Sequence, residues 1–188
     1  MHSIITTALG LFLLSGSAIT NTPVNLPDME VETPKTYSVA MTGYNAVPEQ
    51  TDGEPDTTAS GAFSNPDIIA ARSADLADEL PFGTVIEIVP SSATSSNNCG
   101  ISNVEPFIGY RVIADSMHSR KRNQIDILFD SDVSARVGGK AMNPAVTLGK
   151  CSNVSIRVVG RVDIKKMPKS QIELMRAVGF ATPLSVRN

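Results

Sequence analysis

Two aspartates, Asp115 and Asp126, stand beside two apolar segments of the chain and are separated by ten mostly polar residues. If these segments form neighbouring antiparallel strands, the two side chains lie opposite each other, with Cβ atoms about 4.5–5.5 Å apart. Two carboxyls this close do not ionise independently, so one pKa rises and that group can hold a proton near neutral pH. A protonated carboxyl beside a charged one is suited to cleaving a glycosidic bond, because the leaving oxygen must be protonated. The alternative is that both aspartates only form turns at strand ends.

The elements that must position these aspartates are short strands. The chain of 188 residues is 41% hydrophobic and 5% aromatic, with 13 glycines and 12 prolines, which is typical of a turn-rich, mainly β domain. Apolar and β-branched runs between turn residues predict strands at 37–41, 68–71, 85–89, 110–114, 125–129 and 154–162. About six such strands predict a small barrel or sandwich, and residues 75–80 are expected to form a helical turn.

Charge narrows the class of partner. The 16 basic and 19 acidic residues give a net charge of −3, spread along the chain. This balance argues against a nucleic-acid partner, because the phosphate backbone selects for basic domains. We expect a monomer that needs no cofactor.

The N-terminus predicts export. Residues 4–14 form an apolar run that is short for a bilayer span, and small residues follow it. Gly16 and Ala18 have the spacing of a signal-peptidase site, so we expect a signal peptide over 1–18, cleavage after Ala18, and a periplasmic, cell-wall or extracellular protein without stable membrane insertion. An uncleaved anchor or a buried N-terminal helix is the alternative. We then expect a linker at 19–35, a folded domain at 36–165, and a tail at 166–188 with a helix from Ser170 to Val178.

The two cysteines fit an exported domain. Cys99 and Cys151 are the two cysteines of the chain. Cys99 lies in a predicted surface insertion at 90–103, and Cys151 directly follows a second one at 138–150. An even count in an exported domain predicts one disulfide between them, the alternative being two buried free thiols. The two cysteines and two histidines show no metal-ligand spacing, so no metal site is expected.

Four segments together carry a resemblance to a known family. In chain order they are Thr42-Gly43-Tyr44; Thr58-Ala59-Ser60-Gly61; Ile69-Ala70-Ala71 with Asp75 and Leu80-Pro81-Phe82-Gly83-Thr84 after it; and Ala114-Asp115 with Ile125-Asp126-Ile127 after it. This set resembles the three-aspartate (3D) domain family, the double-psi β-barrel of the catalytic region of membrane-bound lytic transglycosylase A, which is related to RlpA-like barrels. The resemblance covers 36–163 and implies a six-stranded double-psi β-barrel with short helices.

The resemblance also implies a reaction and a site. The three aspartates would be Asp75, Asp115 and Asp126, and the reaction would cleave the MurNAc–GlcNAc bond of peptidoglycan without water. Asp126 would act as general acid and then as base, leaving a 1,6-anhydro product. Asp115 would raise the pKa of Asp126 and orient it, while Asp75 would line the groove. The implied sugar contacts are Tyr44, Thr58, Ser60 and Gly61.

The chain departs from the family at 116–122, where a basic segment replaces a glycine-rich turn. Arg120, Lys121 and Arg122 form either a solvated loop or a site for acidic wall groups, with Arg120 as a substrate contact. His118 is expected to be solvated or at the edge of the substrate. Two other functions remain open: a non-catalytic, expansin-like binder of wall glycan, and a glycoside hydrolase with Asp115 as nucleophile and Asp126 as acid.

Overall fold

The computed structural model describes residues 34–51, 53–89 and 99–180. The predicted signal peptide, nearly all of the predicted linker, most of the predicted insertion at 90–103 and residues 181–188 of the predicted tail lie outside the described residues. Within the described ranges, no helix has the length and apolar character needed to cross a bilayer.

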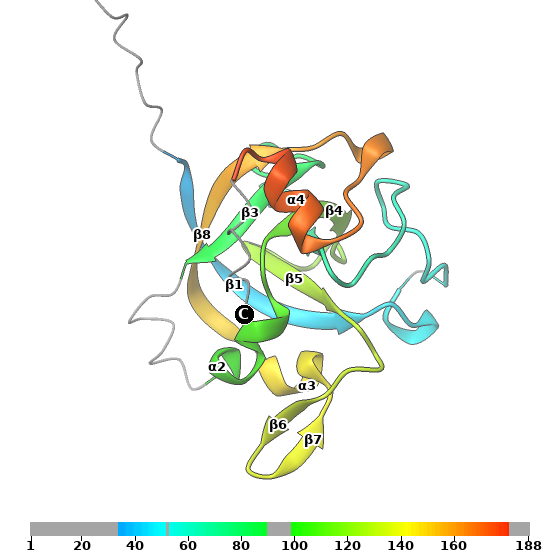
Figure 1. Cartoon of the computed structure of the whole chain (residues 1–188), viewed down its shortest axis with the longest axis vertical. Coiled ribbons are helices and arrows are strands. Elements are labelled where there is room, and N and C mark those ends of the chain that lie inside the picture. Colours follow the sequence, from blue (N-terminus) through cyan, green and yellow to red (C-terminus); the bar gives the residue numbers. More distant parts are fainter. Residues whose placement is uncertain (1–33, 52, 90–98, 181–188) are drawn as a thin grey trace, which may run out of the picture. The chain divides into compact units, whose positions relative to one another are not determined.

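Six strands close into a barrel (Figure 1). They are β1 (Thr36–Asn45), β2 (Ile69–Arg72), β3 (Thr84–Val89), β4 (Arg111–Ser116), β5 (Gln124–Phe129) and β8 (Cys151–Arg161). Their order around the barrel is β1-β5-β2-β4-β3-β8, in which β1 with β5 and β2 with β4 are parallel and the other pairs are antiparallel. Each of the six predicted strands is present. The mainly β prediction is therefore confirmed, and the mixed strand order is compatible with a double-psi barrel.

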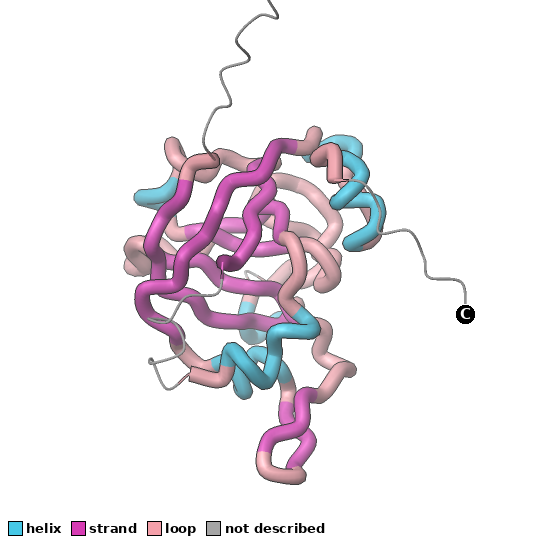
Figure 2. Tube along the Cα trace, turned by 60° about the vertical axis from the view of Figure 1, so that its left-hand side comes forward, coloured by secondary structure: helices cyan, strands magenta, loops and turns pink. Residues whose placement is uncertain are grey.

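Short helices lie between the strands and after the last of them (Figure 2). They are the 3-10 turns η1 (Pro48–Gln50), η2 (Ala74–Leu76), η3 (Glu105–Phe107) and η4 (Ile164–Lys166), and the α-helices α2 (Ile101–Val104), α3 (Pro144–Leu148) and α4 (Gln171–Ala177). The predicted C-terminal helix is α4. The Ser170 side chain accepts from the Glu173 backbone N–H at its start, and Gly179, with φ of 82°, follows its end.

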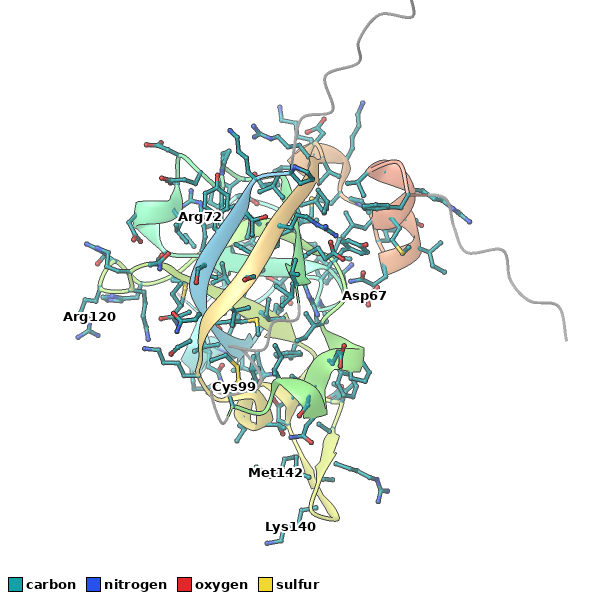
Figure 3. The ribbon with its side chains drawn as sticks, turned by 90° about the vertical axis from the view of Figure 1, so that its left-hand side faces the viewer. Asp67, Arg72, Cys99, Arg120, Lys140 and Met142 are labelled. Atoms are coloured by element: carbon teal, nitrogen blue, oxygen red, sulfur yellow. A yellow bond between two sulfur atoms is a disulfide. The ribbon has the colours of Figure 1, made fainter. Side chains whose placement is uncertain are left out.

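A small hairpin was not anticipated from the sequence. Strand β6 (Ala135–Val137) lies just before the predicted surface insertion at 138–150, and it pairs with β7 (Lys140–Met142), which lies inside that insertion. Gly138 and Gly139 join them with φ of 56° and 82°, the left-handed conformations that a two-residue hairpin turn requires. Figure 3 shows Lys140 and Met142 on this hairpin, away from the barrel strands. The Gly-Gly pair is therefore the sequence signal for the turn.

The barrel strands bury side chains on both faces. On β5, Ile125, Ile127 and Phe129 belong to one buried cluster, whereas Leu128 belongs to a second. Strands covered on both faces lose the simple apolar–polar alternation of a half-exposed sheet. Close packing also fixes Gly43, because a Cβ at this position would lie 2.7 Å from the Phe129 ring. The polar site residues Asp126 and Gln124 lie on the face of β5 that carries Leu128.

The predicted disulfide is present. Cys99 and Cys151 are bonded, with Cα atoms 5.3 Å apart and 52 positions between them in sequence. The bond joins the segment before α2 to the first residue of β8. It therefore closes a long loop and restricts the unfolded chain.

We expect the Cys99→Ser, Cys151→Ser double variant to lose about 2–4 kcal/mol of unfolding free energy, because a loop of this length has high closure entropy. The measurement is guanidinium unfolding of both proteins, with and without a thiol reductant. The reductant should destabilise the wild type and leave the double variant unchanged. Equal stability of the two oxidised proteins would contradict this expectation.

Candidate active site

The two central aspartates flank one strand instead of facing each other directly. Strands β4 and β5 are not neighbours, since β2 lies between them. Ala71 of β2 pairs with Asp115 on one side and with Asp126 on the other. The expectation that the two strands pair directly is therefore wrong: their backbones lie two strand spacings apart, about 10 Å. The pairing depends on β2, about 40 residues earlier in the chain, which a local reading of 110–130 does not contain.

A β-bulge sets the position of Asp115. Along the parallel β2–β4 pair, Ala70 lies opposite Ile113, but Ala71 lies opposite Asp115, so Ala114 is the extra residue. In an unbulged pair Ala114 would stand opposite Ala71. Bulges re-aim side chains in this way and are common beside active sites. The bulge therefore brings both aspartates level with Ala71.

Asp126 has the environment of an acid that can hold a proton. Burial, the largest effect, raises its pKa to about 6. A hydrogen bond from Thr42 Oγ1 to Asp126 Oδ1, 2.8 Å long, and the positive charge of Lys121 act in the opposite direction. The charge of Asp115 raises the pKa as well, but it is the smallest of these four effects. Desolvation, and not the neighbouring Asp115 that the sequence suggested, is therefore the main cause of the raised pKa of Asp126.

Asp115 organises the neighbouring residues. Its Oδ2 accepts from the Tyr44 hydroxyl at 2.8 Å, and its Oδ1 accepts from the backbone N–H groups of Ala59 and Ser116, each at 2.9 Å. Burial, followed by the charge of Asp115, raises the pKa of Tyr44, so its phenol remains protonated and donates. Both carboxylate oxygens of Asp115 are therefore engaged by protein donors. Tyr44 is buried at 9% exposure, which leaves its ring unable to lie flat against a sugar.

An open cleft of about 540 Å³ runs past both aspartates. Its lining combines carboxylates, hydroxyls and basic groups, namely Tyr44, Glu49, Gln50, Thr51, Thr57, Ala59, Ser64, Ala71, Asp115, Ser116, Met117, His118, Lys121 and Asp126. Such a concave, polar site beside a half-buried acid suits a polar ligand such as a saccharide.

The residues Thr58, Ser60 and Gly61 shape one wall of the cleft without lining it. Thr58 is buried at 5% exposure, and its hydroxyl bonds to both the backbone of Ala62 and the hydroxyl of Ser60. Gly61 takes a φ of 81°, which favours glycine, and its N–H donates to the carbonyl of Thr58. This tight turn presents the Ala59 N–H to Asp115.

Asp75 lies apart from the cleft. It is exposed in η2, and its Oδ2 accepts from the Asn123 backbone N–H at 2.9 Å. Hydrogen bonds, chiefly from Ser73 and then from Asn123, hold the pKa of Asp75 below its usual range. Asn123 has a φ of 45° and directly precedes β5. Asp75 therefore holds the end of the 117–123 loop, and the structure does not bring it together with Asp115 and Asp126.

The basic loop is divided between solvent and cleft. Arg120 projects away from the barrel (Figure 3) and does not line the cleft. Lys121 and His118 do line it, and Lys121 lies near enough to lower the pKa of Asp126. Arg122 Nη1 donates to the carbonyls of Ser119 and Lys121 within the loop. Arg120 therefore does not face the cleft as the sequence prediction of a substrate contact requires, whereas binding of acidic wall groups by the loop stays a prediction.

Three residues beside the site were missed from the sequence. Gln124 donates to Thr42, Thr42 donates to Asp126, and Arg111 is fully buried at the start of β4, the strand that carries Asp115. Side chains two residues apart on a strand point to the same face, so Gln124 shares a face with Asp126, and Thr42 shares a face with Tyr44. This alternation is the sequence signal that could have identified both residues. Within the described ranges, no three His, Cys, Asp or Glu side chains lie close enough to hold a metal ion.

The raised pKa of Asp126 makes a prediction about stability. Ionised Asp126 is disfavoured in the fold, so its cost is present above pH 6, shrinks as the pH falls, and is gone below the ordinary value of 3.8. Since asparagine mimics the neutral form, we expect Asp126→Asn to be more stable than the wild type at pH 8, by up to about 3 kcal/mol. The two proteins should be equally stable at about pH 3, below the ordinary value. Chemical unfolding at both pH values measures this, and a variant that is less stable at pH 8 would contradict it.

Comparison of the chain with protein-family models and with curated proteins found no match.

Proposed function

We propose that this protein is a peptidoglycan lytic transglycosylase of the three-aspartate type, with Asp126 as its general acid and base. The observation that carries the proposal is a half-buried carboxyl, with its pKa raised to about 6, at the wall of an open polar cleft. A group with this pKa exists in both protonation states near neutral pH, which a residue that first gives and then takes a proton requires.

In the proposed reaction, the Asp126 proton goes to the glycosidic oxygen between MurNAc and GlcNAc. The bond from this oxygen to the anomeric carbon breaks, and its electron pair stays on the departing sugar hydroxyl. Asp126, now a carboxylate, takes the proton of the MurNAc 6-hydroxyl while the 6-oxygen bonds to the anomeric carbon. The products are a free hydroxyl and a 1,6-anhydro ring, no water is consumed, and Asp126 is protonated again.

The segments that carry the family resemblance support this assignment through their positions. The 42–44 segment supplies the hydroxyl on Asp126 and the phenol on Asp115, the 58–61 turn supplies an N–H to Asp115, and Ala71 separates the aspartates. The hydrolase alternative would use Asp115 as the nucleophile, and the three hydrogen bonds that its oxygens accept make this carboxylate a weaker nucleophile. The proposed substrate is extracytoplasmic, which agrees with the predicted signal peptide.

The test is digestion of purified peptidoglycan by the full chain, with the soluble products identified by mass spectrometry. The proposal expects anhydro-muropeptides, each one water lighter than the hydrolytic product. Hydrated products would replace the proposal with a glycoside hydrolase. Sedimentation with the wall without any release would replace it with a glycan-binding barrel.

A further inference from the structure

The hydroxyl of Thr42 connects Asp126 to a buried amide. Gln124 Nε2 donates to Thr42 Oγ1 at 2.8 Å, and Thr42 Oγ1 donates to Asp126 Oδ1 at 2.8 Å. Because an ionised carboxylate only accepts, the hydroxyl must donate to it, and the amide must then present an N–H to the hydroxyl. The three side chains therefore form a hydrogen-bond chain with one direction.

Backbone contacts hold Gln124, the first donor of this hydrogen-bond chain, in place. Gln124 is 4% exposed, its N–H donates to Ser73 Oγ, and its carbonyl accepts from the Ser73 N–H. Ser73 is itself fully buried. In the parallel register of β1 and β5, Thr42 pairs with Asp126 and Gln124 precedes Asp126 by two residues, on the same strand face. The amide thus has little freedom to turn away from Thr42.

This direction distinguishes the two oxygens of Asp126 when the residue takes up a proton. A proton on Oδ1 would point at the Thr42 hydroxyl, which would have to turn its own hydrogen away from Asp126 while the Gln124 N–H still faces it. A proton on Oδ2 leaves every hydrogen bond of the chain in place. We propose that Gln124 is a positioning residue which, through Thr42, directs the proton of Asp126 to Oδ2, the oxygen that does not accept from Thr42. This inference rests on the proposed role of Asp126 as the acid.

The test is a double-mutant cycle on the protonation of Asp126. The carboxyl carbon resonance of Asp126 is followed by NMR from pH 3 to 9 in the wild type, Gln124→Met, Thr42→Val and the double variant. The titratable groups that face the cleft with Asp126 stay the same in all four proteins; they are Tyr44, Glu49, Asp115, His118 and Lys121.

Thr42→Val removes a hydrogen bond to the ionised form, so we expect its titration midpoint to move up by about one pH unit. Gln124→Met should move it up by less, because the released hydroxyl donates to Asp126 for part of the time. The double variant should match Thr42→Val, since Gln124 acts only through Thr42. Thr42→Ser, which keeps the hydroxyl, should restore the wild-type midpoint. If Gln124→Met does not fold, Gln124→Asn, whose amide is one methylene too short to reach Thr42, takes its place.

The rate of peptidoglycan digestion supplies a second readout. Gln124→Met should lower kcat about tenfold with little change in KM, because a proton on Oδ1 does not reach the glycosidic oxygen. A wild-type midpoint in Gln124→Met, or a further shift when Gln124→Met is added to Thr42→Val, would overturn the inference. If neither the wild type nor any variant releases product, the proposed function is wrong. The titration midpoints still test, independently, whether Gln124 acts on Asp126 through Thr42.

Discussion

Replacing Asp126 with asparagine should lower the rate of muropeptide release by about 10²–10⁴-fold, the usual contribution of a positioned general acid. Asparagine keeps the size of the side chain and an oxygen that accepts from Thr42, but it carries no proton to donate. In the wild type the rate should also fall as the pH rises through about 6, because burial places the pKa of Asp126 there and only the protonated form starts the reaction. The measurement is the initial rate of release from purified peptidoglycan between pH 4 and 8.

The matched control is Asp132→Asn, which changes an exposed aspartate on the turn after β5. It should leave both the rate and the pH profile unchanged. If Asp126→Asn releases product at the wild-type rate, another group supplies the proton and the assignment of Asp126 fails. A rate that rises with pH through 6 would contradict the protonated state that we assign.

Replacing Arg111 with methionine should cost about 3–5 kcal/mol of unfolding free energy, the largest effect on stability that we expect. The guanidinium is fully buried, and burial lowers its pKa to about 10, still far above neutral pH. Its Nη1 donates to the carbonyls of Pro66, Ile69 and Leu128, and its Nη2 donates to that of Phe107. Methionine fills the space of the aliphatic stem but leaves these four carbonyls without their donor.

These bonds tie together the strands that carry the aspartates. Arg111 begins β4, while Ile69 belongs to β2 and Leu128 to β5. The control is Arg157→Met, which removes the half-exposed ion pair with Glu87 and should cost less than about 1 kcal/mol. Urea unfolding of the three proteins gives the comparison. A loss as small for Arg111→Met as for Arg157→Met would show that the buried guanidinium does not hold the strands.

The strands could be predicted from the sequence because each is a short apolar or β-branched run bounded by turn residues. The helix α4 could be predicted because Ser170 and Gly179 mark its ends. These signals are local: they depend on residues within a few positions of one another. The disulfide could be predicted because the chain has two cysteines, which allow one pairing, and its N-terminus predicts export.

What could not be predicted is non-local. The insertion of β2 between β4 and β5 depends on pairing with a distant segment, and the bulge at Ala114 depends on the register of that pairing. The geometry of the site could not be predicted for the same two reasons. Asp115 and Asp126 line one cleft, but they lie on either side of Ala71. Desolvation therefore raises the pKa of Asp126 more than the charge of Asp115 does. Asp75 shares the sequence pattern of the other two aspartates, yet its contacts hold a loop.

The most direct test of the central claim is digestion of purified peptidoglycan in water enriched in the heavy oxygen isotope, by the wild type and by Asp126→Asn. A lytic reaction draws its new ring oxygen from the sugar, so the wild type should release anhydro-muropeptides that carry no heavy oxygen at the new end. Asp126→Asn should release almost none. Incorporation of the heavy isotope at the new sugar ends would identify a hydrolase and contradict the account.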